Sequence, residues 1–253
     1  MRFFKMTKTY SIIIASIKGG VGKTTVAVNL AIALSIAGYK TLLYEMDTVN
    51  PGVGYHLGKL DDESRVQVYK PTGLQYVPAR VSESSDAMVP ERVSQLESEI
   101  KNGDYDFVIV DTQSAEKSLL KKHFDNGLII INPDEQSCAA GIMAKDMVES
   151  SGAKCNIMLN RGFEKPYALS DKEIEEMFGT PIMARAEEDL SLRKSLLSHV
   201  PNVLTENAPK FNDQINKLAR VYAAMIDEDY AQKFENFSKE LNRAKSEIKK
   251  LQK

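Results

Sequence analysis

Short apolar runs recur along the chain, separated by longer stretches in which apolar residues return at helical spacing. Several runs have no polar residue at alternate positions, which is typical of strands that helices cover on both faces. Such strands alternating with helices predict an α/β fold with a mostly parallel, doubly covered sheet and a ligand site at the carboxyl ends of the strands. The predicted strands are residues 10–16, 41–46, 74–77, 105–110, 127–131, 155–159 and 180–184.

Two of the intervening helices have recognisable first turns. Ser170 and Glu173 form a capping-box pattern ahead of the apolar Ile174, and Pro209 opens an amphipathic stretch that runs to residue 226. Residues 58–72 are polar and irregular. We therefore expect a connection without regular structure beyond the second strand.

An apolar stripe near the end of the chain has spacings that alternate between four and three residues. This pattern predicts a helix with one narrow apolar seam, and it divides the chain into a domain of residues 1–229 and a basic amphipathic helical tail of residues 230–253. The narrow seam favours a coiled coil with a partner helix or a second copy; an anionic membrane surface, the chain's own domain and nucleic acid are the alternatives. The stripe consists of Tyr230, Phe234, Phe237, Leu241, Ala244, Ile248 and Leu251.

A glycine-rich segment joins the first strand to the first helix, with residues 18–25 reading Lys-Gly-Gly-Val-Gly-Lys-Thr-Thr. Closely spaced glycines let the backbone curl so that its N–H groups point inward, and the positive end of the following helix adds to this nest, so a polyphosphate fits it. In such a loop Lys23 reaches the β- and γ-phosphates and Thr24 binds Mg²⁺. The alternative is a plain turn with two solvated lysines.

The loop departs from the usual pattern at its start, where Ile17 stands in the place of the first glycine and Lys18 follows. A loop opened by lysine resembles the deviant Walker A family of P-loop ATPases, which includes MinD and ParA, and the resemblance extends over residues 10–226. It implies ATP and Mg²⁺ as cofactors and a homodimer that encloses two ATP molecules, with Lys18 reaching the partner's nucleotide. It assigns nucleotide binding in the loop to Gly19, Gly20, Val21, Gly22, Lys23, Thr24 and Thr25.

Acidic residues end two of the predicted strands. By resemblance, Asp111 is the Walker B aspartate that holds Mg²⁺ through water, and Asp47 is the switch I aspartate that positions the attacking water. The family generally shows Asp-x-Asp at the second strand, whereas Glu45 replaces the first aspartate here. A helix-capping role for Asp111 and a solvated strand-end acid at Asp47 are the alternatives.

Asn160 and Arg161 end a later strand, and an asparagine there resembles the family's contact to the adenine edge. An amide offers a donor and an acceptor together, which suits that edge; helix capping is the alternative. The switch II segment reads Asp-Thr-Gln-Ser-Ala, so Ala115 replaces the family's glycine. We therefore expect slow ATP turnover.

The composition and net charge of the chain bear on its domain number, its location and its attraction to DNA. The 253 residues and 43% apolar content fit one α/β domain, and the apolar runs are shorter than the roughly 20 residues of a membrane span. The first residues lack a secretory pattern, so we expect a cytoplasmic protein, with peripheral association at a membrane or the nucleoid left open. The net charge of −2 gives no general attraction to DNA, which would need a local basic patch. Candidates for such a patch are Lys117, Lys121, Lys122, Arg185, Arg193 and Lys194.

Three functions fit this sequence. The favoured one is a slow, partner-stimulated, dimerising ATPase that positions or partitions a cargo such as DNA, the division machinery or another large assembly. The second is a nucleotide-binding adaptor with negligible turnover. The third is a metal-cluster carrier of the same superfamily, although the chain has only Cys138 and Cys155 and no Cys-x-x-Cys pair.

Overall fold

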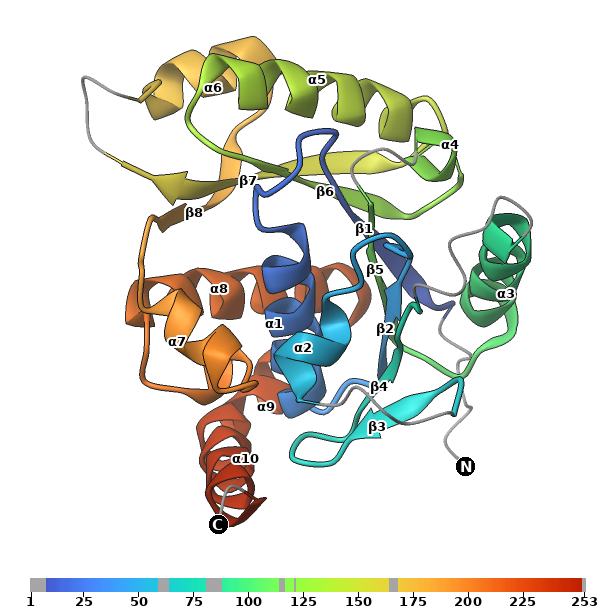
Figure 1. The fold of residues 1–253 in the computed structure, drawn as a ribbon, viewed down its shortest axis with the longest axis vertical. Coiled ribbons are helices and arrows are strands. Elements are labelled where there is room, and N and C mark those ends of the chain that lie inside the picture. Colours follow the sequence, from blue (N-terminus) through green and yellow to red (C-terminus); the bar gives the residue numbers. More distant parts are fainter. Residues whose placement is uncertain are drawn as a thin grey trace.

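The computed structural model describes residues 8–58, 64–80, 88–113, 117–120, 122–163 and 168–251. Within these residues one sheet has eight strands in the order β3-β4-β2-β5-β1-β6-β7-β8 (Figure 1). Neighbouring strands are parallel except β3 and β4, which are antiparallel. The strands are β1 (Tyr10–Ala15), β2 (Thr41–Glu45), β3 (Gln67–Tyr69), β4 (Leu74–Val77), β5 (Phe107–Asp111), β6 (Asn126–Ile131), β7 (Lys154–Gly162) and β8 (Ile182–Glu187).

The predicted α/β fold with a mostly parallel, doubly covered sheet is confirmed, and each strand expected from an apolar run is present. The expectation of an irregular segment over residues 58–72 was wrong in part, because β3 lies there at the edge of the sheet. Gln67 and Tyr69 of β3 are buried and Val68 is exposed. Three residues with a buried glutamine give too short and too polar a pattern to be read as a strand.

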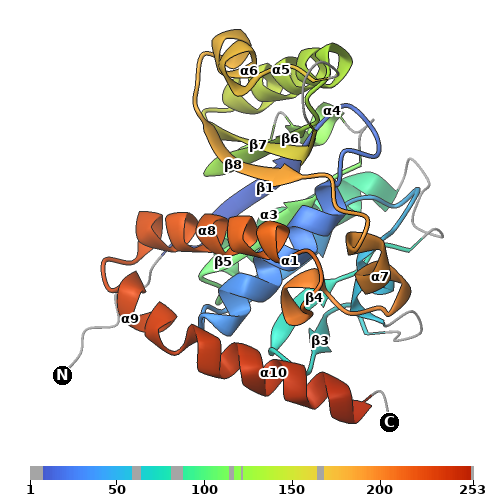
Figure 2. The same cartoon turned by 90° about the vertical axis from the view of Figure 1, so that its left-hand side faces the viewer.

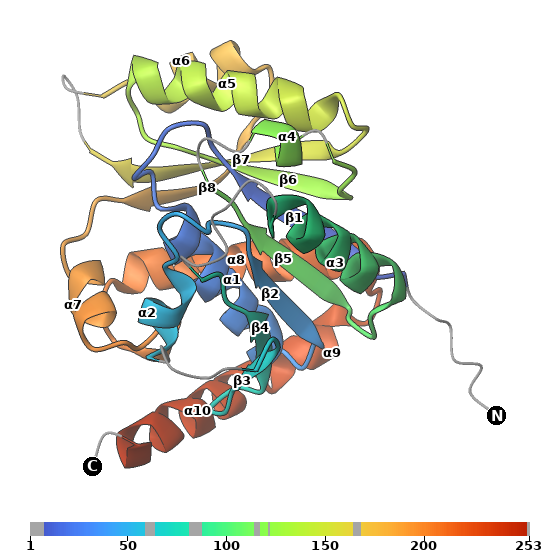
Figure 3. The same cartoon turned by 45° about the vertical axis from the view of Figure 1, so that its right-hand side comes forward.

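Helices cover both faces of this sheet. Figure 3 shows α3 in front of β5 and α8 behind it. Successive residues of β1 belong alternately to the apolar clusters on these two faces. Ile12 and Ile14 belong to the apolar cluster under α1 and α8, whereas Ile13 and Ala15 belong to the cluster under α3 and α5. The helices are α1 (Lys23–Ile36), α2 (Val53–Leu57), α3 (Met88–Asn102), α4 (Lys117–Leu120), α5 (Glu135–Glu149), α6 (Asp171–Phe178), α7 (Leu192–Leu197), α8 (Pro209–Ile226), α9 (Tyr230–Glu235) and α10 (Phe237–Leu251), with a 3₁₀ turn, η2, at Asn202–Leu204.

Both predicted helix starts are confirmed. The Ser170 side chain accepts a hydrogen bond from the Glu173 N–H and the Glu173 carboxylate accepts one from the Ser170 N–H, which completes the capping box of α6. Helix α8 begins at Pro209 and ends at Ile226, as its pattern predicts. No described helix combines the length and apolar character that crossing a bilayer requires.

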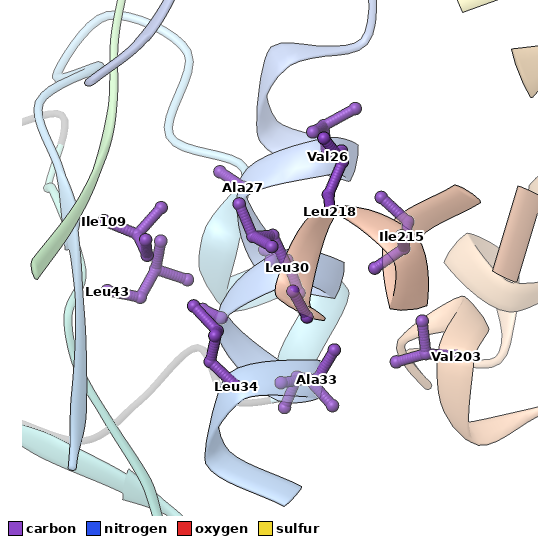
Figure 4. Close-up of a cluster of buried hydrophobic side chains, with 14 of the residues drawn as sticks. Val26, Ala27, Leu30, Ala33, Leu34, Leu43, Ile109, Val203, Ile215 and Leu218 are labelled. Carbon is purple, nitrogen blue, oxygen red and sulfur yellow. The ribbon is translucent and has the colours of Figure 1, made fainter. Parts of the chain in front are cut away.

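Helix α1, which follows the glycine-rich loop, is buried on nearly all sides. Its residue Leu30 lies between Leu43 and Ile109 of the sheet and Ile215 and Leu218 of α8 (Figure 4). A helix that is apolar around its whole circumference is stable only inside a core. This burial fixes the N-terminal end of α1 against the carboxyl edge of the sheet.

The apolar stripe of the tail packs against the chain's own domain. Phe234, Phe237, Ala244 and Ile248 are buried in the same cluster as α1, and α10 runs beneath α1 and α8 in Figure 2. The rings of Phe234 and Phe237 stack with centroids 5.5 Å apart. The structure therefore shows the tail packed against its own domain, which was an alternative in the sequence analysis, and not in the coiled coil that the seam favoured. Of the stripe residues only Leu251, which is 69% exposed, extends beyond this packing.

Candidate nucleotide-binding site

The glycine-rich loop between β1 and α1 has the curled backbone that a phosphate nest requires. Gly20 and Gly22 have φ values of 75° and 101°, in the left-handed region that favours glycine. A Cβ atom on Gly22 would also lie 2.4 Å from the Nδ2 atom of Asn160, so any other residue there would displace that side chain. Val21, between the two glycines, is fully buried and holds the loop against the domain.

Lys23 is the first residue of α1 and lies inside the protein, with 7% of its surface exposed. Burial lowers the pKa of its ammonium group, and the nearby carboxylates of Asp111 and Asp47 oppose that shift. Both acids predicted at the strand ends thus lie within electrostatic range of the loop lysine. The structure brings these three predicted residues together.

Lys18 has a different environment. Its Nζ atom lies 2.8 Å from Oδ1 and 3.1 Å from Oδ2 of Asp134, and its side chain is 26% exposed. Asp134 is also the N-cap of α5, because its carboxylate accepts a hydrogen bond from the Ser137 N–H at 2.8 Å. Lys18 is therefore bound within its own chain, at the surface beside the loop.

Asp111 is completely buried at the end of β5, and within the described residues neither of its carboxylate oxygens has a hydrogen-bond partner. Burial, followed by the charge of Glu45, raises the pKa of Asp111 to about 8, while Thr24 and Lys23 oppose this shift. An unpartnered carboxylate near a threonine hydroxyl at the mouth of a phosphate nest fits Mg²⁺, which prefers oxygen ligands. The capping alternative for Asp111 does not hold, because Asp111 is the last residue of β5 and the two residues that follow it, Thr112 and Gln113, are not helical.

Glu45 has a structural role that the sequence did not indicate. It pairs in register with Asp111 across β2 and β5, and its carboxylate accepts hydrogen bonds from the backbone N–H groups of Gly52, Val53 and Ala79. The carboxylate therefore ties the end of β2 to the start of α2 and to the segment after β4. Burial raises the pKa of Glu45 to about 7, although these three hydrogen bonds act in the opposite direction.

Arg92 of α3 reinforces the same corner from the other side of the sheet. Its guanidinium is buried and donates to the backbone carbonyls of Glu45 and Pro78, the latter at 3.0 Å. It also lies 5.0 Å from the ring centroid of Tyr44. These contacts hold the ends of β2 and β4 in place, next to the loop that carries Asp47.

Asp47 itself is partly exposed and closes a turn. Its Oδ1 atom accepts hydrogen bonds from the N–H groups of Val49 at 3.2 Å and Asn50 at 2.8 Å. The side chain is thus more than a solvated strand-end acid, because it orders the segment between β2 and α2. It raises the pKa of Asp111, which places it at the same edge of the sheet.

A cavity of about 210 Å³ adjoins the loop, and we call it the nucleoside cavity after the ligand that the sequence predicts at Asn160. Asn160 is 4% exposed and its Nδ2 atom donates to the Val21 carbonyl at 2.8 Å, which leaves its Oδ1 atom as a buried acceptor without a partner in the described residues. Asn160 lies inside β7, so it does not cap a helix. The cavity is lined by Gly22, Thr25, His56, Asn160, Arg161, Glu188, Asp189, Leu192, Arg193 and Leu196.

Other predicted residues contribute less to the site. Arg161 lines the nucleoside cavity with φ of 54°, and its Nε atom lies 3.6 Å from Glu188. Of the DNA candidates, Lys122 pairs with Glu97 at 3.0 Å, Arg185 pairs with Asp171, and Arg193 lines the cavity. Ala115, Lys121 and the side chain of Lys117 lie outside the described part of the chain.

Comparison with known proteins gives a consistent picture. The family model described as "CobQ/CobB/MinD/ParA nucleotide binding domain" matches residues 12–251. An uncharacterized ATP-binding protein of Methanocaldococcus jannaschii, MJ0169, is 26% identical over 236 residues, covering 85% of this chain and 88% of that protein. An iron-sulfur cluster carrier protein of Pyrococcus horikoshii is 29% identical over 248 residues, covering 79% of this chain and 81% of that protein. The structure of the septum site-determining protein MinD of Pyrococcus horikoshii, complexed with Mg-ADP, shares the fold with a TM-score of 0.73 at 22% identity, covering 87% of this chain and 98% of that one.

Proposed function

The chain belongs to the CobQ/CobB/MinD/ParA family of nucleotide-binding domains, and on this premise we propose that it is an ATP-dependent dimerising switch. Binding of ATP with Mg²⁺ joins two copies, and hydrolysis releases them. The dimer positions or partitions a cargo, such as DNA, the division machinery or another large assembly. Turnover is slow and is stimulated by a partner.

The contrast between the two loop lysines carries this proposal. Lys23 is 7% exposed and lies inside its own nest, where it serves the phosphates of its own nucleotide. The side chain of Lys18 is 26% exposed and pairs with Asp134 at the surface beside the nest. A lysine at the surface beside the nest could reach the nucleotide of a second copy once it leaves Asp134, which supports a trans role.

The same geometry supports ATP as the nucleotide. The buried Oδ1 acceptor of Asn160 suits the exocyclic amine at C6 of adenine and would oppose the carbonyl oxygen that guanine has at the same position. Thr24 and Asp111 would hold Mg²⁺, which supplies positive charge to the phosphate oxygens when bound. Asp47, in its ordered turn, would orient the attacking water.

The direct test is the mass of the protein in solution with and without AMP-PNP and Mg²⁺. We expect the wild type to form a dimer with AMP-PNP, and Lys18→Ala to bind the nucleotide but remain a monomer. Lys145→Ala is the matched control, since it removes a lysine whose ion pair with Glu149 lies within α5. A Lys18→Ala protein that dimerises and hydrolyses ATP normally would refute the proposed mechanism.

Phosphate release separates the switch from a structural adaptor. A rate that rises on addition of DNA, anionic vesicles or a candidate partner supports the switch, whereas a negligible rate under every condition supports the adaptor. Vesicle co-sedimentation and gel shift on nonspecific DNA, each with ATP and with ADP, would identify the surface on which the dimer works.

We do not extend the cluster-carrier role of the Pyrococcus relative to this chain. Cluster ligation needs several thiolates held close together, and the two cysteines of this chain are 17 positions apart with no Cys-x-x-Cys pair. Burial, together with Asp134, raises the pKa of the Cys138 thiol to about 11, and burial raises that of Cys155 to about 12. Cys138 is also fully buried. Both side chains have the character of core thiols.

A further inference from the structure

His56 is the one aromatic residue among those that line the nucleoside cavity in the described part of the chain. It lies on α2, the short helix that follows the turn of Asp47. Sequence patterns do not predict a role for it, because a single histidine within a five-residue helix has no recognisable pattern. It lines the same cavity as Asn160 and Thr25, which is the predicted base-binding end of the site.

Helix α2 is fastened at both ends, so the position of His56 is well defined. At its start, the Glu45 carboxylate accepts hydrogen bonds from the Gly52 and Val53 N–H groups. Near its end, the Nδ1 atom of His199 lies 2.7 Å from the Tyr55 carbonyl oxygen. The helix packs between α1 and α7 (Figure 1).

The chemistry of the His56 ring suits contact with a nucleoside. Burial lowers its pKa to about 4, so the imidazole is neutral near pH 7. Within the described residues the ring makes no hydrogen bond, and Leu192 and Leu196 supply apolar surface to the same cavity. A flat, uncharged ring can pack against a nucleobase and still offer one donor and one acceptor.

We propose that His56 packs against the purine nucleoside of the bound nucleotide and so links the Asp47 segment to the nucleoside cavity. Asn160 reads the base edge from β7, while His56 covers the nucleoside from α2. Binding of a nucleoside in the cavity then affects the position of the residues that follow β2. This inference rests on the proposed binding of ATP and adds a specific contact to it.

The test compares ADP with tripolyphosphate, which fills the phosphate nest but has no nucleoside. We expect His56→Ala to weaken ADP binding by about tenfold in calorimetry, as loss of a stacked ring does, and to leave tripolyphosphate binding unchanged. His56→Phe should bind ADP within about threefold of the wild type, since it keeps the ring. Tyr55→Ala is the matched control, because Tyr55 is 52% exposed on the same helix and does not line the cavity.

Two results would overturn the inference. ADP binding by His56→Ala at the wild-type level excludes the contact, and an equal loss of ADP and tripolyphosphate assigns the effect to the loop. Failure of the wild type to bind ADP while it binds tripolyphosphate would instead overturn the proposed nucleotide function.

The NMR signals of the histidine rings test the proposed contact in the wild-type protein, even where His56→Ala fails to fold. The chain has three histidines, and the signal absent from His56→Phe identifies His56. We expect ADP to shift this signal strongly and tripolyphosphate to leave it nearly unchanged. A signal that does not respond to ADP would contradict the proposal.

Discussion

The ammonium group of Lys18 is bound by Asp134, the residue that caps α5, with Nζ to carboxylate distances of 2.8 and 3.1 Å. One carboxylate therefore serves both as a helix cap and as the partner of the loop-opening lysine. If Lys18 acts on the nucleotide of a second copy, it must first leave Asp134. The ion pair then opposes dimerisation, and its strength becomes part of the dimer's affinity.

Replacing Asp134 with asparagine separates the two roles, because asparagine caps helices as well as aspartate does but carries no charge. We expect Asp134→Asn to lose at most about 1 kcal/mol of protomer stability, the contribution of a partly exposed pair, and to dimerise with AMP-PNP up to about fivefold more tightly per protomer. Analytical ultracentrifugation would measure the dissociation constant. Asp134→Ala is the comparison, as it should also lose about 1 kcal/mol of stability with the cap. An unchanged or weaker dimer in Asp134→Asn would show that the pair does not compete with assembly.

Restoring the family's usual aspartate at position 45 should destabilise this protein. Glu45 accepts hydrogen bonds from the Gly52, Val53 and Ala79 N–H groups, and a side chain shorter by one methylene cannot reach all three. We expect Glu45→Asp to lose about 1 to 3 kcal/mol, the penalty of leaving a buried donor unsatisfied, and Glu45→Ala to lose more. Urea unfolding would measure both. Stability equal to wild type in Glu45→Asp would mean that the chain can shift to keep these bonds.

Local patterns predicted the strands and the loop because their determinants lie close together in sequence. The continuous apolar run before Asp111 suffices for β5, and the glycines at positions 20 and 22 suffice for the nest. The role of Glu45 was not predictable in this way, since the Ala79 N–H that it binds lies 34 residues away. The surface against which the tail packs was not predictable from local patterns either.

The apolar stripe of the tail predicts a helix with a seam, but the identity of the surface that covers Phe237 depends on the folded position of α1. His56 likewise enters the nucleoside cavity only because α2 is folded against α1 and α7.

Asp111→Asn should change the metal-free and the nucleotide-bound protein in opposite directions. Without metal, burial opposes ionisation of the wild-type carboxyl and raises its pKa to about 8, so a neutral amide, which has no charge to neutralise, should raise stability by about 1 to 3 kcal/mol near pH 7. The same change should remove the added stabilisation that Mg²⁺ gives to the ADP complex. Melting temperatures with and without Mg-ADP measure both effects. Asp47→Asn is the control, since the partly exposed turn at Asp47 can form with asparagine. If Mg-ADP stabilised Asp111→Asn as much as the wild type, Asp111 would be excluded as a metal-binding residue.

Base preference should depend on Asn160. Its Nδ2 atom supports the Val21 carbonyl of the loop, so Asn160→Ala should weaken both ATP and GTP through the loop. Loss of the Oδ1 acceptor should weaken ATP alone, and we expect the ratio of ATP to GTP affinity to fall by about tenfold. Competition binding of the two nucleotides gives this ratio independently of the loop effect. A ratio that does not change would place the adenine contact elsewhere.

The buried seam of the tail should make Phe237 a stability residue. Phe237 is 6% exposed and stacks on Phe234, so Phe237→Ala should lower the free energy of unfolding by about 3 kcal/mol. Leu251→Ala, at the exposed end of the same stripe, should change it by less than about 0.5 kcal/mol. Urea unfolding of both variants, together with their co-sedimentation with anionic vesicles, distinguishes a core seam from a lipid-binding one. If Phe237→Ala kept its stability but lost vesicle binding that the wild type shows, the seam would have to leave the domain to contact lipid, and the packing of α10 against the domain would describe only the unbound state.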